Sequence, residues 1–368
     1  MTGTIAAIIL ALSINASTAA RIDAVFSAYD HRGSPGFALG IIKDEALLYV
    51  RGYGDANIEN SVPIDERTDF HLASLSKQFT ASAIALLVLQ RRLSLDDPVA
   101  KYVPRASVFG PALRVKDLVY MTSGLPDYSA LRRANGLPWY SSYYFTRDEA
   151  LAAVFASRKL LFAPGTRYDY TNTNYMLLTK IVERVTGIPF ATYMHETIFT
   201  PLGMTGTLVN DDPTQIIPHR AYGYAPRVSK VIAQLKSVGI TARAGSGWIY
   251  LARTSPHFGG SGVFSNIDDL AKWDTDWYSQ QLAPGFTALM TTRERFAFGA
   301  MDGMGLGFRA VYGKLAIDYS GADIDASTFM ERIPSERFTI ICLSNDPLGD
   351  AEEKADAVLA ILQEEHII

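Results

Sequence analysis

The chain has 368 residues, of which 48% are hydrophobic and 20% charged, so its composition excludes a disordered chain or a coiled coil and is typical of a globular protein with a large core. Its formal net charge of −4 comes from 34 basic and 38 acidic residues with no basic run, which argues against a nucleic-acid-binding protein. We therefore expect a small-molecule or peptide partner and no nucleic acid.

The first 20 residues resemble a secretory signal. An apolar segment from Ile5 to Ile14 precedes small residues that end at Ala19 and Ala20. The apolar segment is too short to span a membrane, and no Lys or Arg precedes it, so the usual basic start is missing. A buried or amphipathic N-terminal helix is the alternative. We predict a signal peptide over residues 1–20, a periplasmic or secreted protein, and no stable membrane span.

Strand patterns occur at the two ends of the chain and helix patterns between them. Residues 36–53 contain two extended runs joined by a polar turn, which predicts a β-hairpin. Four more β-rich runs lie within residues 305–346, and a helix is expected from Glu352 to about Gln363. Residues 78–203 contain helical segments, the clearest being "QFTASAIALLVLQRRL", "TRDEALAAVFAS" and "TNYMLLTKIVERVTG".

This order of elements predicts an α+β fold. One antiparallel sheet would be built from the N- and C-terminal segments and flanked by helices, with a mainly helical region inserted between them. We expect residues 21–90 and 255–368 to form the sheet region and residues 91–254 the helical region, together making one catalytic unit. The active site would lie in the cleft between the two regions.

The stretch "FHLASLSKQFT" holds a serine and a lysine three residues apart at the expected start of a helix. Ser74 and Lys77 would share one helical face, which Ser76 could not. A lysine kept neutral by burial can take the proton of a serine nucleophile, and N–H groups at a helix start favour developing negative charge. Alone, the pattern is expected on the order of once by chance in a chain of this length. The alternative is a helix-capping serine and a solvated lysine.

A second element, Tyr170-Thr171-Asn172, occurs once in the chain. A phenol beside Lys77 would have its pKa lowered by the ammonium and could relay a proton between serine, leaving group and water. The amide of Asn172 would bond to Lys77 or to a substrate carbonyl. The alternative is an aromatic helix start packed on the core, with asparagine as its cap.

Together these elements resemble the superfamily of serine β-lactamases and penicillin-binding proteins, most closely its class C branch with the family VIII esterases and D-amino-acid peptidases. Further phrases similar to the family's text follow in its order: "LSLDDPVAKYVP", "TSGLPDY", "FAPGTRYDYTNTNYMLL", "TPLGMTGT" and "GGSGVFSNIDDLAKW". The resemblance implies a class C β-lactamase-like fold. It makes Ser74 the acylated serine, Lys77 the lysine, Tyr170 the tyrosine base and Asn172 the partner of lysine and substrate. Because the acylating base is disputed among relatives, we assign proton transfer to Lys77 and Tyr170 jointly.

The third motif of that family departs from its pattern. Where relatives carry a triplet led by Lys or His and ending in glycine, this chain has Tyr319-Ser320-Gly321. Gly321 still lets the backbone approach a substrate, and the N–H of Ala322 is the expected second oxyanion donor beside that of Ser74. Tyr319 replaces a cation that helps relatives hold a substrate carboxylate. This favours an esterase, or an amidase for neutral substrates, over a β-lactamase.

We therefore expect a serine hydrolase that forms an acyl-enzyme on Ser74, with small or neutral acyl esters as substrates. The alternatives are a D-amino-acid peptidase or amidase, a weak β-lactamase and, in another class, a non-hydrolytic protein that is acylated once and acts as a sensor or binding module. No cofactor is expected, and no histidine pair has the spacing of metal ligands with a third partner. His71, on the strand entering the site, is expected to point away from it or to serve packing.

Overall fold

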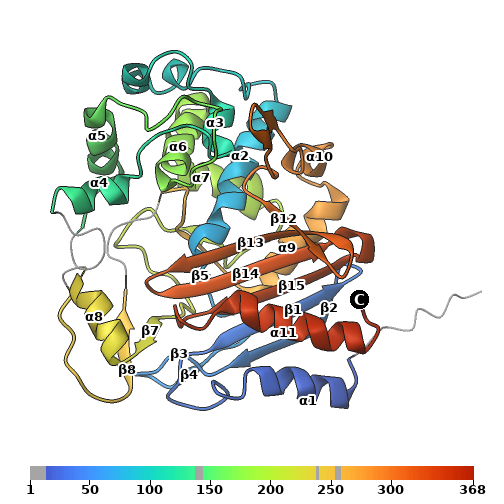
Figure 1. Cartoon of the computed structure of the whole chain (residues 1–368). Helices are drawn as coiled ribbons and strands as arrows, with labels where there is room; N and C mark the ends of the chain where they lie inside the picture. The colour runs from blue at the N-terminus through green and yellow to red at the C-terminus, as the bar shows by residue number, and fades with distance from the viewer. Residues whose placement is uncertain (1–13, 137–143, 238–239, 253–257) are drawn as a thin grey trace, which may run out of the picture.

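A computed structural model describes residues 14–136, 144–237, 240–252 and 258–368. Within these residues, six strands form one antiparallel sheet in the order β12-β13-β14-β15-β1-β2, in which β1 pairs with β15 (Figure 1). The predicted sheet built from both ends of the chain is confirmed. Its strands are β1 (Phe37–Lys43), β2 (Ala46–Tyr53), β12 (Gly307–Val311), β13 (Lys314–Asp323), β14 (Ala326–Ile333) and β15 (Phe338–Ser344).

The predicted hairpin is formed by β1 and β2. Its two-residue turn, Asp44 and Glu45, has φ angles of 51° and 65°, the positive values that tight hairpin turns require. Strand β1 is buried on both faces, because Leu39 belongs to one hydrophobic cluster and Ala38 to another. The centre of the sheet is therefore covered on both sides.

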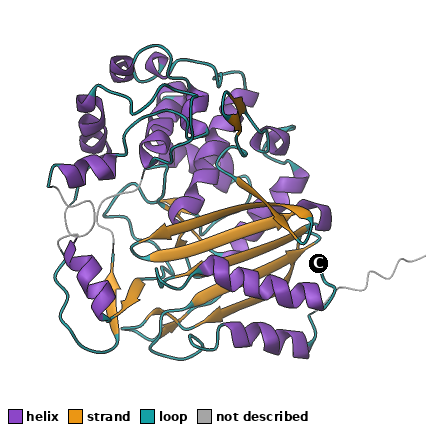
Figure 2. Ribbon diagram, in the orientation of Figure 1, coloured by secondary structure: helices purple, strands orange, loops and turns teal. Residues whose placement is uncertain are grey.

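Helices cover both faces of this sheet (Figure 2). Helix α11 (Ala351–Glu364), which confirms the predicted C-terminal helix, packs with α1 (Ala16–Val25) and contacts β14 and β15. Helix α9 (Ile267–Ser279) contacts β1, β2 and β15. Its Asp274 forms a fully buried ion pair with the sheet, since Oδ1 accepts from Nε of Arg332 at 2.6 Å and from Oγ1 of Thr339 at 2.8 Å.

The predicted helices between the two ends of the chain are present as α2 (Lys77–Leu89), α5 (Arg147–Ser157) and α6 (Asn172–Thr186), which lie above the sheet in Figure 1. Helix α6 ends at Gly187, whose φ of 83° places it in the left-handed region. The division into residues 21–90, 91–254 and 255–368 stays a prediction. Shorter helices are α3 (Val115–Val119), α4 (Tyr128–Ala134), α7 (Phe190–Met194), α8 (Ser229–Ser237) and α10 (Phe286–Met290).

Small sheets complete the described fold. One of them, in the order β5-β9-β6, holds the chain that leads into the Ser74 region. The strands of the small sheets are β3 (Asp55–Asn57), β4 (Val62–Pro63), β5 (Phe70–His71), β6 (Leu208–Val209), β7 (Gly223–Pro226), β8 (Trp248–Leu251), β9 (Val263–Ser265), β10 (Arg295–Phe296) and β11 (Gly299–Ala300).

The predicted signal peptide lies largely outside the described residues. The described part of it runs into helix α1, which begins after the N-cap Asn15 and buries Thr18. The predicted export stays a prediction. Among the residues that the structure describes, no helix is both long and apolar enough to cross a membrane.

Candidate active site

Ser74 lies in a 3₁₀ turn, Ala73–Ser76, that leads directly into helix α2. Ala73 has a φ of 48°, an uncommon value for a residue with a side chain, so the chain bends sharply just before Ser74. Ser74 is partly exposed, whereas Ser76 is buried and its Oγ accepts from the N–H of Val263 at 3.1 Å. The expectation that Ser74, and not Ser76, faces Lys77 agrees with this arrangement.

Lys77 is wholly buried and its Nζ has three hydrogen-bond acceptors. It donates to Oγ of Ser74 at 3.1 Å, to Oδ1 of Asn172 at 2.9 Å and to the carbonyl of Gly260 at 2.6 Å. The rings of Tyr170 and Tyr175 have their centroids 4.8 and 5.7 Å from Nζ. This geometry excludes the solvated lysine of the alternative interpretation.

Burial lowers the pKa of Lys77 to about 7, because removing the ammonium from water disfavours its charged form. The carboxylates of Asp127 and Asp323 oppose this effect, since they favour the ammonium. The result is an amine that exists in both protonation states near neutral pH, as a base for a serine hydroxyl requires.

Tyr170 places its hydroxyl 2.7 Å from Oγ of Ser74. The predicted lowering of its pKa is wrong: loss of water around the phenol raises the pKa of Tyr170 to about 12, and the hydrogen bond with Ser74 offsets only part of this effect. Asp127 and Asp323 raise it further. The hydroxyl of Tyr170 is therefore protonated at neutral pH, so it can donate a proton but does not start as a phenolate.

Asn172 is held in place from the start of helix α6. Its backbone N–H donates to Oδ2 of Asp127 at 2.9 Å, and its side-chain oxygen accepts from Lys77. Oδ1 of Asp127 caps helix α4 by accepting from the N–H groups of Ser129 and Ala130. Asp127 thus joins two helix starts at the site. Sequence analysis missed this role, although an Asp directly before a helix is a recognisable N-cap.

Strand β13 carries the third motif across the 3₁₀ turn of Ser74. A Cβ added to Gly321 would lie 2.4 Å from the carbonyl oxygen of Leu72 and 2.3 Å from Oγ1 of Thr328, so only glycine fits at this approach. Loss of water around the phenol raises the pKa of Tyr319 well above its ordinary value, and the nearby phenol of Tyr170 adds to this effect. Ala322 is exposed on the same strand, and its role as an oxyanion donor stays a prediction.

A pocket of about 290 Å³ lies beside Tyr319. Aromatic side chains, methionines, other apolar groups and glycine backbone form most of its wall, and Asp302 is the charged residue among the described lining residues. No Lys or Arg belongs to this described lining. Its wall is formed by Val119, Tyr120, Met121, Tyr168, Tyr175, Met301, Asp302, Gly303, Gly305, Leu306, Gly307 and Tyr319.

His71 is buried and stacks on Phe264, as expected of a residue that serves packing, and both of its ring nitrogens have hydrogen-bond partners. Its Nε2 lies 2.7 Å from Oγ of Ser261 and its Nδ1 lies 2.8 Å from Oδ1 of Asp325. Ser261 directly follows Gly260, whose carbonyl accepts from Lys77. Within the described residues, no group of three or more His, Cys, Asp or Glu side chains could hold a metal ion.

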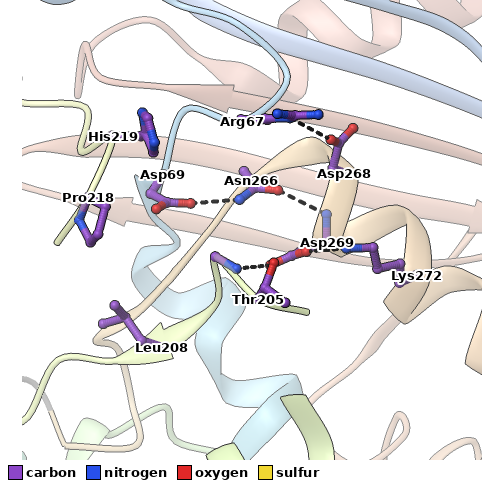
Figure 3. Close-up of a pocket in the computed structure, with 11 residues that line it drawn as sticks. Arg67, Asp69, Thr205, Leu208, Pro218, His219, Asn266, Asp268, Asp269 and Lys272 are labelled. Carbon is purple, nitrogen blue, oxygen red and sulfur yellow. Dashed lines mark hydrogen bonds and ion pairs between the residues drawn. The ribbon is translucent and has the colours of Figure 1, made fainter. Parts of the chain in front are cut away.

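A separate cavity of about 380 Å³ lies beside the β5-β9-β6 sheet (Figure 3). Its charged groups bond within the wall: Asp69 accepts from Asn266 at 2.7 Å, and Asp269 accepts from Lys272 at 2.8 Å. Burial raises the pKa of Asp69 to about 7, and the nearby carboxylate of Asp269 adds to that effect. We assign no ligand to this cavity.

Comparison with known proteins identifies a family that the chain matches. The family model described as Beta-lactamase matches residues 22–364. A D-aminopeptidase from Gluconobacter oxydans (strain 621H) is 28% identical over 333 residues, which cover 89% of this chain and 59% of the relative. The chain therefore spans less than two thirds of that relative.

Solved structures have the same fold. The D-amino acid amidase from Ochrobactrum anthropi SV3, in complex with L-phenylalanine, matches with a TM-score of 0.80 at 22% identity, over 95% of this chain and 99% of the amidase. EstCE1, a hydrolase with promiscuous acyltransferase activity, matches with a TM-score of 0.72 at 20% identity, over 94% of this chain and 98% of that chain. Because the family match also covers nearly the whole sequence, the chain belongs to the Beta-lactamase family, in the serine hydrolase superfamily of serine β-lactamases and penicillin-binding proteins.

Proposed function

We propose that this protein is a serine hydrolase that cleaves the amide bond of D-amino-acid amides or peptides through an acyl-enzyme on Ser74. The observation that carries the proposal is the convergence of Ser74, Lys77, Tyr170 and Asn172 on one hydrogen-bonded centre. A serine bonded both to a buried amine of lowered pKa and to a protonated phenol has the groups that acyl transfer needs.

In the proposed acylation step, neutral Lys77 takes the proton of the Ser74 hydroxyl as Oγ attacks the substrate carbonyl. The backbone N–H groups of Ser74 and Ala322 receive the developing oxyanion. Tyr170 then gives its proton to the leaving nitrogen as the C–N bond breaks, and the Lys77 ammonium returns a proton to the phenolate. Because Oδ1 of Asn172 already accepts from Lys77, its amide N–H₂ is left to donate to the substrate.

Water completes the proposed cycle. It attacks the acyl carbon with Lys77 as the base, a second oxyanion forms and collapses, and Ser74 leaves with a proton. Each bond formed is balanced by one broken, and the products are a free carboxylic acid and an amine.

The choice of substrate rests on the pocket beside Tyr319. An amino-acid amide carries a free ammonium on its α-carbon, and it has an amide in place of the free carboxylate. The described pocket wall contains no Lys or Arg, and its one carboxylate, Asp302, is paired with Arg293 at 3.6 Å, so the wall offers no cation to a substrate carboxylate. The D-aminopeptidase relative and the fold shared with a D-amino acid amidase support the same substrate class.

The esterase predicted from the sequence alone is not confirmed, and it becomes the second candidate. Tyr319 and the largely apolar pocket favour neutral acyl groups, and the hydrolase EstCE1 has this fold. β-Lactam hydrolysis is disfavoured, because the described pocket offers no cation to the substrate carboxylate.

One preparation tested on a matched set of substrates separates these functions. We expect D-phenylalanine p-nitroanilide to be hydrolysed faster than its L-isomer and its N-acetyl derivative, and nitrocefin to be hydrolysed slowest. Hydrolysis of p-nitrophenyl butyrate without detectable hydrolysis of either p-nitroanilide isomer would favour the esterase. The control is Ser74→Ala, which must lose hydrolysis of every substrate. A lasting mass adduct on wild type without turnover would favour the non-hydrolytic sensor.

A further inference from the structure

Three side chains that the proposed chemistry does not use form a hydrogen-bonded row, of which the aspartate and the histidine are buried. Oδ1 of Asp325 lies 2.8 Å from Nδ1 of His71, whose Nε2 lies 2.7 Å from Oγ of Ser261. His71 is 3% and Asp325 6% exposed, so the pair is shielded from water. Because a carboxylate only accepts, Nδ1 carries a hydrogen, and in the neutral ring Nε2 accepts from the hydroxyl of Ser261.

The row ties together three separate parts of the chain. Asp325 lies in the turn between β13 and β14, His71 is on β5, and Ser261 belongs to the glycine-rich loop before β9. The ring of His71 also stacks on that of Phe264, with centroids 5.2 Å apart and planes at 24°. His71 and Phe264 are also direct partners in the β5-β9 pairing.

Ser261 connects this row to the proposed base. It directly follows Gly260, whose carbonyl is 2.6 Å from Nζ of Lys77, the shortest of the three bonds that Nζ makes. Glycines flank Ser261 on both sides, and Gly259 and Gly262 have φ angles of 71° and 97°. A backbone with this much conformational freedom needs a side-chain anchor to hold one carbonyl in place.

We propose that Asp325 and His71 anchor Ser261 and thereby hold the Gly260 carbonyl against Lys77, which makes His71 a positioning residue for the base. The proposal rests on the proposed function, since it gives Lys77 the role of base. The row has the order of a Ser-His-Asp triad, but its serine anchors the loop and is not the nucleophile.

The Gly260 carbonyl affects both the place and the charge of Lys77. A carbonyl oxygen can accept a hydrogen bond but cannot donate one, so the Gly260 carbonyl favours the protonated form of Lys77, as do Asp127 and Asp323, while loss of water around the amine opposes that form. Loss of the anchor therefore has two consequences. Reaction of Ser74 slows because the amine is less well placed, and the pH at which the amine loses its proton falls.

The test measures the rate at which a fluorophosphonate labels Ser74 as a function of pH, which requires no knowledge of the substrate. In Ser261→Ala and His71→Gln, we expect the plateau rate to fall about ten- to hundredfold. The acid limb should also move to lower pH by roughly half a unit or more. Ser261→Ala keeps the His71–Asp325 pair. His71→Gln keeps a polar group toward Ser261 and should lose less than His71→Leu.

Phe264→Leu is the matched control, because it removes the stacking on His71 but leaves the hydrogen-bonded row. It should lower the melting temperature without moving the acid limb. If Ser261→Ala and His71→Gln both keep the wild-type plateau rate and the wild-type acid limb, the positioning role alone is overturned. A shift of the acid limb in Phe264→Leu as large as that in the other two variants would also overturn it. Label mapped to Ser261 would make that serine a nucleophile, against the proposal. Labelling that persists in Ser74→Ala would instead overturn the proposed nucleophile, and the positioning role with it.

Discussion

Nζ of Lys77 lies 3.1 Å from Oγ of Ser74 at a point where the amine has no contact with water. The two atoms are one helical turn apart in sequence, yet the amine is held by a loop more than 180 residues further along the chain. The proposed reactivity of Ser74 therefore depends on long-range packing as well as on the local motif.

The pH dependence of the reaction should follow Lys77. Its pKa of about 7 is well below the ordinary value of a lysine, and only the neutral amine can act as a base. Activity should rise as pH rises through about 7 and then level off, because the phenol of Tyr170 stays protonated well above that range. Lys77→Met should reduce kcat/KM by about 10²–10⁴-fold and abolish the rise of activity with pH. An unchanged rise in Lys77→Met would assign it to another group.

Tyr170→Phe tests the proton donor. The change removes one hydroxyl from a ring that is 40% exposed, so the melting temperature should stay close to that of wild type. Turnover of an anilide should fall by about 10²–10⁴-fold because the leaving amine receives no proton. Tyr312→Phe, which removes the hydroxyl of an exposed tyrosine outside the wall of the pocket beside Tyr319, is the matched control. Equal losses in both variants would remove the special role of Tyr170.

Asp69 should make folding stability depend on pH. Its folded pKa of about 7 lies above its ordinary value of 3.8, so between these values the folded state binds the proton more tightly than the unfolded chain. The free energy of unfolding should therefore fall as pH rises from about 4 to 7, by up to roughly 1.4 kcal/mol per pH unit from this group.

Asp69→Asn should abolish that fall while keeping an acceptor for Asn266. Denaturation of both proteins at several pH values measures the difference. The control is Asp268→Asn in the same cavity, whose side chain is 33% exposed and pairs with Arg67. If the stability of Asp69→Asn falls with pH as steeply as that of wild type, the carboxyl group is not the cause.

The buried ion pair between Asp274 and Arg332 should be costly to break from one side. Asp274→Ala leaves a guanidinium without its partner inside the protein, so the free energy of unfolding should decrease by about 3–5 kcal/mol. The double variant Asp274→Leu with Arg332→Met removes both charges and should lose much less. Urea denaturation gives both values. A double variant less stable than the single one would contradict this account.

Much of the sheet could be predicted because its signals are local. The turn at Asp44 and Glu45 and the alternation of short β-rich runs with turn residues indicate strands wherever they lie in the fold. The three-stranded sheet of β5, β9 and β6 was harder, because strands of two or three residues carry too few positions for a pattern.

The site shows a similar division. Two short motifs were enough to name four residues of the site, and the resemblance to a family indicated that they lie in one centre. These residues are Ser74, Lys77, Tyr170 and Asn172. The role of the Gly260 carbonyl could not be predicted from a motif, since every residue has a backbone carbonyl and the sequence does not show which one faces Lys77. The pKa of Tyr170 was predicted in the wrong direction because sequence shows the neighbouring charge but not the loss of water.

The pairing of β1 with β15 has a consequence for how the protein is made. While the ribosome synthesises the roughly 300 residues between these strands, the hairpin of β1 and β2 has an open, strongly apolar edge. Closing a loop of that length is slow, and an unpaired edge of this kind invites association with other chains. A nascent chain should therefore need protection, from a chaperone or from its own helices, until β15 has left the exit tunnel.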